Sequence, residues 1–331
     1  MATQEPSDTD AQVSYAVALL RLMRIPNVFT AIADVLMGFA FVHQSFQPVG
    51  GLIFLVLATM CLYSAGMIWN DIFDVEVDTK ERPDRPIPSG AISLKSAWLW
   101  GTGLLCVGFL SASMSFVLFG DTASPLWFGF EPGIVALLLI VAILLYNKTL
   151  KKTVLAPVAM GSCRTLNVLL GMSLASGDHV DIFPSGLLLA LSIGVFISGV
   201  TWFARSEARE SDRGLLSFGF GVIVIGLVGI MATPFWGYPL PETVNDNKPY
   251  LLPFMIGLIG LSIGRLALMA IADPIPAHVQ VTIKQCIMSI ILIDAAICLW
   301  IDPRPQSIYL AFSVVVLIFP AILFGRWFKS T

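Results

Sequence analysis

Long apolar stretches alternate with short polar ones along almost the whole chain. A helix needs about 20 consecutive apolar residues to cross a bilayer core of about 30 Å. Ten stretches approach or exceed that length, and we predict ten membrane-spanning helices, or nine if one segment lies at the membrane surface or re-enters. The predicted helices cover residues 15–43, 51–74, 94–119, 133–147, 153–176, 185–207, 214–236, 251–272, 278–301 and 307–328.

Composition supports this pattern. The chain has 331 residues, of which 56% are hydrophobic and only 12% are charged, about half the charged fraction of a soluble protein. We therefore predict an all-α, polytopic membrane helical bundle. Residues 1–14 form a polar N-terminal tail, and residues 15–331 form a single transmembrane domain. We expect membrane lipid around this domain and no nucleic acid as a partner.

The basic residues indicate how the helices are oriented. If the N-terminus is cytoplasmic, fifteen of the nineteen Lys and Arg residues fall in cytoplasmic segments, and only Lys248 and Arg304 fall outside. This positive-inside bias predicts that both termini are cytoplasmic, in a bacterial inner or organellar membrane. The two remaining basic residues, Arg164 and Arg265, lie within predicted membrane segments.

A run of acidic residues ends the second predicted helix, on the cytoplasmic side. Asn70, Asp74 and Asp78 recur every four residues, which places them on one helix face with Asp71 beside them. Carboxylates at this spacing repel one another unless a cation lies between them. Mg²⁺ prefers such oxygen ligands, and these four residues are the predicted metal ligands.

Cations follow the acidic run directly, at Lys80, Arg82 and Arg85, among prolines at 83, 86 and 88 that stop the helix. Carboxylates for a metal beside cations for an anion favour a metal-bridged phosphate or diphosphate. A second charged stretch, residues 201–214, ends the sixth predicted helix on the same side, and three lysines lie in residues 146–152. The charges of residues 201–214 bind either one another or an anion.

Single charges inside the membrane are functional candidates by default. Arg164 lies about a dozen residues into its predicted helix, and we expect it to belong to the site. Asp34 and Asp294 are either groups of an acceptor site or partners of Arg265.

These residues resemble the UbiA superfamily of intramembrane prenyltransferases along most of the chain. Asn70, Asp74 and Asp78 match its N-x-x-x-D-x-x-x-D motif, and residues 82–90 are similar to its RxxRPxPSG continuation. Arg24 to Asn27 resemble its R-x-x-N sequence in the first helix. Tyr146, Lys148, Lys152, Arg164 and Gly171 resemble its region of the fourth and fifth helices.

The chain departs from the family in its second acidic motif, which is usually D-x-x-x-D. Residues 205–212 read RSEARESD, so glutamates and arginines stand where the family has aspartates. This altered motif resembles a divergent UbiA-like branch found with Ebo-type gene clusters. The family also commonly has nine helices, one fewer than the ten predicted for this chain.

The resemblance implies Mg²⁺-dependent transfer of an isoprenyl group from a prenyl diphosphate to a lipophilic, aromatic or hydroxyl-bearing acceptor, through an allyl cation. Because water would quench the allyl cation, we expect the cytoplasmic loops 79–93 and 208–213 to form a cap. Asp74, Asp78 and Arg164 are the predicted catalytic residues. The predicted metal ligands are Asn70, Asp71, Asp74, Asp78, Glu207 and Glu210. The predicted diphosphate-binding residues are Arg24, Asn27, Arg82, Arg85, Lys148, Lys152, Arg205 and Arg209.

Two alternatives remain at this point. A secondary transporter or exporter component has a similar number of helices and intramembrane charges, but its binding site lies near the bilayer midplane rather than at helix ends. The altered second motif is also compatible with a protein that binds a prenyl lipid without turning it over.

Overall fold

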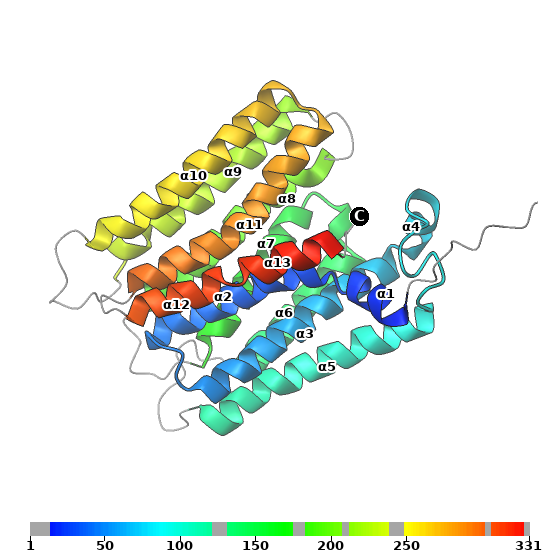
Figure 1. Ribbon diagram of the computed structural model, residues 1–331, viewed down its shortest axis with the longest axis horizontal. Helices are drawn as coiled ribbons and strands as arrows, with labels where there is room; N and C mark the ends of the chain where they lie inside the picture. Colours follow the sequence, from blue (N-terminus) through cyan, green and yellow to red (C-terminus); the bar gives the residue numbers. More distant parts are fainter. Residues whose placement is uncertain are drawn as a thin grey trace, which may run out of the picture.

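The computed structural model of the chain describes residues 14–120, 131–174, 183–206, 212–237, 248–301 and 306–327. All regular elements in these ranges are helices, and the long ones lie side by side in a bundle (Figure 1). The α-helices are α1 (Tyr15–Leu22), α2 (Ile25–His43), α3 (Val49–Phe73), α4 (Val75–Glu81), α5 (Leu94–Phe119), α6 (Pro132–Lys148), α7 (Ala156–Met172), α8 (Phe183–Phe203), α9 (Arg213–Ala232), α10 (Lys248–Ala272), α11 (Pro276–Ile301), α12 (Gln306–Val315) and α13 (Ile318–Trp327). Three short 3₁₀ turns, η1 (Leu150–Lys152), η3 (Ala204–Ser206) and η4 (Thr233–Phe235), extend α6, α8 and α9.

Each predicted apolar stretch corresponds to helix. Within the described ranges, eight helical spans are long and apolar enough to cross a bilayer: α2, α3, α5, α8, α9, α10, α11, and the stretch that joins α12 to α13. The helices α6 and α7 have 17 residues each, which corresponds to only about 26 Å. The chain is an all-α integral membrane protein, as its composition predicts.

The first predicted helix is broken in two. Arg24 adopts a left-handed backbone conformation, with φ 50° and ψ 49°, between α1 and α2. Pro26 lies in the first turn of α2, where it lacks the N–H group that would continue the hydrogen bonds of α1. The resulting elbow turns the Arg24 side chain toward α3, where its guanidinium pairs with Asp71.

The acidic run also contains a small break. Helix α3 ends at Phe73 and α4 begins at Val75, with Asp74 at φ −93° and ψ 0° between them. The backbone N–H of Asp74 still donates to Asn70 O (3.1 Å), and that of Asp78 donates to Asp74 O (2.8 Å). The predicted spacing of four residues per turn is therefore kept across the break, and the helix ends where the prolines begin.

Helices α2 and α7 lie between two hydrophobic cores. One core joins α2 and α7 to α1, α3, α5 and α6, and the other joins them to α8–α13. The two helices approach closely, because a Cβ atom on Gly38 would lie 2.6 Å from Val168 O and one on Gly171 would lie 2.5 Å from Val35 O. Neither position accepts a side chain without separating α2 from α7.

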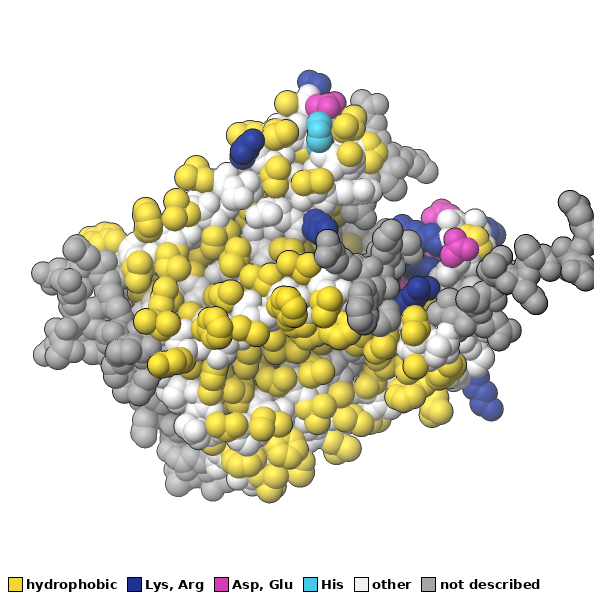
Figure 2. All heavy atoms as spheres, in the orientation of Figure 1, with side chains coloured by type: hydrophobic (Ala, Val, Ile, Leu, Met, Phe, Trp, Pro, Cys, Tyr) yellow, Lys and Arg dark blue, Asp and Glu magenta, His cyan; other side chains and the backbone are white. Residues whose placement is uncertain are grey.

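Charge and apolar surface are distributed unequally. In Figure 2 apolar side chains cover the sides of the helices, while Lys, Arg, Asp and Glu gather near α4 and near the turn between α10 and α11. Both places are at the same end of the bundle in Figure 1. The loop between α4 and α5 is the described part of the predicted cap, and residues 208–211 of its second loop lie outside the described residues.

Candidate active site

The charged end of the bundle holds a group of side chains that we call the end cluster: Asn70, Asp71, Asp74 and Asp78, with Arg24, Arg85 and Lys151. Its acidic members pair with two arginines and one lysine. Arg85 Nη1 donates to Asp78 Oδ2 (2.6 Å) and to Asp71 Oδ1 (3.3 Å), and all three side chains are almost fully buried. Asp71 Oδ1 also accepts from Arg24 Nη2 (3.2 Å).

The other two acidic-motif residues face a lysine. Lys151 Nζ donates to Asn70 Oδ1 (2.7 Å) and forms an ion pair with Asp74 Oδ2. Sequence reasoning placed Lys148 and Lys152 at the site but not Lys151. The 3₁₀ turn η1 at the end of α6 decides which of these lysines points at α3.

The metal prediction is only partly addressed by this arrangement. Among the described residues, no three His, Cys, Asp or Glu side chains converge on one point. The Asn70 and Asp74 oxygens nevertheless share one ammonium group, which shows that they can face a single cation. These oxygens suit a hard cation such as Mg²⁺. Glu207 and Glu210, and with them Arg209, lie outside the described residues.

The predicted anion-binding cations fall into two sets. Arg82, Lys148 and Lys152 are exposed, and within the described ranges they pair with no carboxylate. Arg85 is buried against the aspartates instead. Arg205 Nη2 donates to Thr153 O (2.9 Å), which brings the end of α8 beside the lysine-bearing loop.

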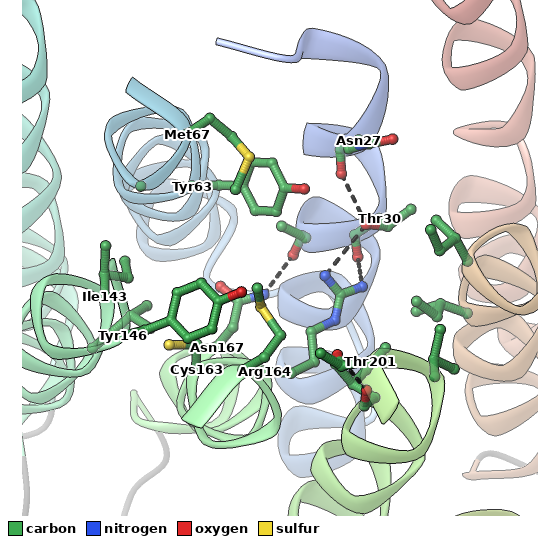
Figure 3. Close-up of a pocket in the computed structure, with 18 of the residues that line it drawn as sticks. Asn27, Thr30, Tyr63, Met67, Ile143, Tyr146, Cys163, Arg164, Asn167 and Thr201 are labelled. Carbon is green, nitrogen blue, oxygen red and sulfur yellow. Dashed lines mark hydrogen bonds between the residues drawn. The ribbon is translucent and has the colours of Figure 1, made fainter. Parts of the chain in front are cut away.

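A pocket of about 290 Å³ lies between α2, α3, α6, α7, α8 and α11. Its wall is mostly apolar, with polar groups from α2, α3 and α7, and the predicted residues Asn27 and Arg164 belong to it (Figure 3). The apolar lining consists largely of Met67, Leu139, Ile143, Met160, Ile197, Val200, Ile283, Ile287 and Ile290.

The pocket lies about one helical turn from the end cluster along three segments of the chain. Asn27 lies one turn beyond Arg24 on α2, and Met67 lies one turn before Asn70 on α3. On α6, the lining residue Asn147 lies four residues before Lys151. Three separate helices therefore lead from the pocket wall to the charged side chains.

A second group of polar side chains, which we call the core cluster, lies deeper in the bundle: Asp34, Thr59, Arg164, Asn167 and Asp294. Arg164 Nε lies 2.6 Å from Asp34 Oδ2. Asn167 Nδ2 donates to the same oxygen (3.0 Å), and Thr59 Oγ1 donates to Asn167 Oδ1 (2.6 Å). The Asp294 carboxyl is fully buried close to that of Asp34. Two carboxylates beside the single Arg164 cation leave one negative charge, which one proton or one further cation would balance.

The core cluster changes the interpretation of Arg164. Its Nη2 donates to Thr30 O (2.8 Å) and its Nη1 to Thr30 Oγ1 (3.3 Å), so the guanidinium points at α2 from the pocket wall (Figure 3). Of the two alternatives for Asp34, pairing with Arg265 is contradicted, because Asp34 pairs with Arg164. Arg265 is exposed on α10, and within the described ranges it forms no ion pair with Asp294 either.

Several site residues were missed by sequence reasoning. Thr30, Tyr63 and Asn167 line the pocket, but each lies in an apolar stretch where nothing marks it. Asn167 follows Arg164 by three residues and therefore shares its helix face, and that spacing is the one signal that was available.

Comparison with known proteins gives the family of the chain. The UbiA prenyltransferase family matches residues 31–270. A digeranylgeranylglyceryl phosphate synthase of Sulfolobus acidocaldarius is 33% identical over 255 residues, which are 74% of this chain and 84% of that protein. The synthase of the same name from Metallosphaera sedula is 34% identical over 134 residues, but the match spans only 40% of this chain and 43% of that protein.

A solved structure shares the fold. A UbiA homologue from Archaeoglobus fulgidus, bound to GPP and Mg²⁺, superposes with a TM-score of 0.56 over 90% of this chain and 99% of the other. The two sequences are only 14% identical, so the similarity concerns the helical bundle.

Proposed function

Because the chain belongs to the UbiA prenyltransferase family, we propose that it transfers a prenyl group from a prenyl diphosphate to an acceptor within the membrane. The observation that carries this proposal is the position of the end cluster, one helical turn from an apolar pocket. A prenyl diphosphate has the same two parts: an apolar chain and a strongly anionic head. Sequence relatives named digeranylgeranylglyceryl phosphate synthase support the same chemistry.

The anionic head binds at the end cluster in this proposal. Asn70 and Asp74 hold Mg²⁺, with the second acidic stretch at residues 207–210 completing the site. A bound magnesium ion supplies positive charge to the leaving diphosphate. Arg82, Lys148 and Lys152 are exposed and pair with no carboxylate of the described residues. In this proposal they neutralise the outer phosphate oxygens through charge-assisted hydrogen bonds.

The prenyl chain occupies the apolar pocket. Burial of apolar surface stabilises such a complex by about 25 cal/mol per Å², and isoleucines from α11 line one side of the pocket. The same wall limits the access of water to an allyl cation once the C–O bond breaks. The aromatic rings of Tyr63 and Tyr146 line the pocket, where their faces favour a positive charge.

Arg164 acts on the pocket through its partners. An unpaired guanidinium beside the developing allyl cation would repel it. Asp34 neutralises the Arg164 charge, and Thr30 holds its orientation. The pair therefore gives the pocket a polar wall without a net positive charge, and Arg164 supports the reaction from there rather than by contact with the diphosphate.

The acceptor attacks the allyl cation directly. The names of the relatives favour a hydroxyl-bearing lipid as the acceptor to be tested first. We propose that the charged end faces the cytoplasm, since that is the side to which the basic residues assign it, and that the loop between α4 and α5 covers the diphosphate.

The direct test is a turnover assay. The full chain is placed in nanodiscs with Mg²⁺, a labelled prenyl diphosphate and a panel of hydroxyl-bearing and aromatic lipids. We expect labelled product and an equal amount of pyrophosphate, both lost in Asp74→Ala. Binding of the diphosphate without product across the panel would instead support the lipid-binding alternative, and vectorial movement of the unmodified lipid would support the transporter.

A further inference from the structure

The four acidic-motif residues are divided between two arginines and one lysine, and this division points to different roles. We propose that Asp71 and Asp78 are positioning residues and not metal ligands. They anchor Arg85, and with it the proline-rich loop of residues 82–92, while Asn70 and Asp74 alone face the exchangeable cation. This inference rests on the proposed function, because it assigns different roles to residues of the same proposed metal site.

Arg85 occupies the space between Asp71 and Asp78. One of its nitrogens, Nη1, contacts both carboxylates, at 3.3 Å and 2.6 Å. The side chains of Arg85, Asp71 and Asp78 are 8%, 6% and 6% exposed, so this ion group is shielded from water. A divalent ion held by the same carboxylates would lie beside the guanidinium and be repelled by it.

Asp71 Oδ1 has no remaining capacity for a metal. It accepts hydrogen bonds from Arg24 Nη2 (3.2 Å), Arg85 Nη1 (3.3 Å) and Asn70 Nδ2 (3.2 Å), whereas a carboxylate oxygen offers about two lone-pair sites. The bond from Asn70 Nδ2 also orients the amide so that its Oδ1 faces Lys151. Through Oδ1, Asp71 thus orients a proposed metal ligand, as outer partners of metal sites commonly do.

Asp71, on α3, connects its own helix to two other segments. Arg24 comes from the elbow between α1 and α2, and Arg85 comes from the loop after α4. Arg24 keeps a left-handed backbone that a non-glycine residue rarely adopts, and such a conformation persists where surrounding contacts hold it. The salt bridge to Asp71 is one of those contacts.

Asn70 and Asp74, the other two residues of the motif, pair with a more exposed cation. The side chains of Lys151 and Asp74 are 29% and 16% exposed. A lysine carries its charge on a flexible four-carbon stem, so Lys151 can leave Asn70 and Asp74 when a divalent cation arrives. Arg85 is buried and bound on two sides, and it has no such freedom.

The loop that Arg85 anchors has its own hydrogen bonds, which provide a measurement. Ser89 N donates to Arg85 O (2.9 Å), and Ile92 N donates to Pro86 O (2.9 Å). Gly90 turns the chain with φ 78°, a conformation suited to glycine. If Arg85 loses its anchor, these backbone amides open more often and exchange with solvent faster.

The experiment compares Asp71→Asn and Asp78→Asn with Asp74→Asn in the full chain. Mn²⁺ affinity is measured without substrate, and hydrogen–deuterium exchange is followed at residues 86–92. We expect Asp74→Asn to weaken Mn²⁺ binding at least about tenfold and to leave exchange unchanged. We expect Asp78→Asn to keep the Mn²⁺ affinity within about twofold. We expect Asp71→Asn, which still offers an amide oxygen to Asn70 Nδ2, to weaken Mn²⁺ binding less than Asp74→Asn does. Both variants are expected to accelerate exchange about tenfold.

Two further variants control the comparison. Glu76→Gln removes an exposed carboxylate from the same helix, α4, and is expected to change neither quantity. Arg85→Lys keeps a cation between the aspartates but loses the planar guanidinium, and it is expected to accelerate exchange at residues 86–92 without affecting Mn²⁺.

The inference is overturned if Asp71→Asn or Asp78→Asn weakens Mn²⁺ binding as much as Asp74→Asn does, or if neither accelerates exchange. Failure of the proposed function looks different: Asp74→Asn would leave Mn²⁺ affinity unchanged, and the unaltered protein would release no pyrophosphate. The exchange measurement requires neither metal nor turnover, so it decides the anchoring role independently.

Discussion

The end cluster and the core cluster both pair aspartates with basic side chains, but the Lys151–Asp74 pair of the end cluster and the Arg164–Asp34 pair of the core cluster differ in access to water. In the end cluster, Lys151 and Asp74 are 29% and 16% exposed. In the core cluster, Arg164 is 10% exposed and Asp34 is fully buried. An ion pair near water can exchange one partner for another at small cost, whereas a buried pair leaves an uncompensated charge when one partner leaves. The first arrangement suits a site where a substrate or metal ion binds, and the second suits a fixed part of the pocket wall.

The comparison is tested most strongly at Asp74. In Asp74→Ala the end cluster loses a proposed metal ligand, and we expect kcat for prenyl transfer to fall by roughly 10²–10³-fold, as for other groups that stabilise transition-state charge. Thermal unfolding is expected to change little, because Asp74 is partly exposed. The matched control is Glu76→Ala. Full activity in Asp74→Ala would end the proposed role of the end cluster.

In the core cluster we expect the larger effect of a substitution to be on stability rather than on kcat. Arg164→Met leaves Asp34 buried without its cation, and we expect the free energy of unfolding to fall by about 3–5 kcal/mol. Replacing both partners, as Asp34→Asn with Arg164→Met, is expected to recover part of that loss, since a buried pair replaced as a unit is often neutral.

The measurement is a double-mutant cycle on unfolding in detergent micelles, with Arg265→Met as the exposed control. Strictly additive losses in the double variant would show that Asp34 and Arg164 do not stabilise each other. The exposed Arg265 lies on α10, away from both, and its replacement is expected to change stability by less than about 0.5 kcal/mol.

The Lys151→Gln variant tests whether a metal ion replaces Lys151 at Asn70 and Asp74. Lys151→Gln removes the ammonium group that competes with a metal at Asn70 and Asp74. We expect Mn²⁺ to bind about three- to tenfold more tightly without substrate, since a charge interaction of about 1 kcal/mol is lost. Activity is expected to fall, because the lysine moves to the diphosphate when the metal binds. Weaker Mn²⁺ binding in this variant would contradict the exchange.

The two clusters also differ in how far sequence alone predicts them. Asn70, Asp74 and Asp78 belong to one helical repeat, so their common face follows from local geometry. The choice of Lys151 over Lys148 and Lys152 depends on a single 3₁₀ turn that no periodic pattern reveals. Helix positions were well predicted because most of the apolar stretches are long enough to span the membrane, and only α6 and α7 are shorter.

Long-range pairs were not predictable in this way. Asp34 and Arg164 are 130 residues apart, and their contact requires α2 and α7 to pack closely at Gly38 and Gly171. Sequence reasoning recognised that an intramembrane charge needs a partner, but it offered Arg265, because hydropathy carries no information on which helices are neighbours. The elbow at Arg24 was missed for a related reason: one apolar stretch contains both α1 and α2.

The smallest expected effect tests how rigid the core cluster is. Thr59 Oγ1 donates to Asn167 Oδ1 at 2.6 Å, and Asn167 in turn donates to Asp34. Thr59→Val removes that donor at nearly constant volume. We expect a loss of about 0.6 kcal/mol, and at most about 1.7 kcal/mol, the range measured for hydrogen bonds between membrane helices. Because Asn167 retains its bonds to Asp34 and Ala31 O, KM for the prenyl diphosphate is expected to stay within about twofold. Ser64→Ala on the same helix is the control. A large rise in KM would mean that the core cluster adjusts to the substrate, and the distinction between a fixed wall and an exchangeable end would then fail.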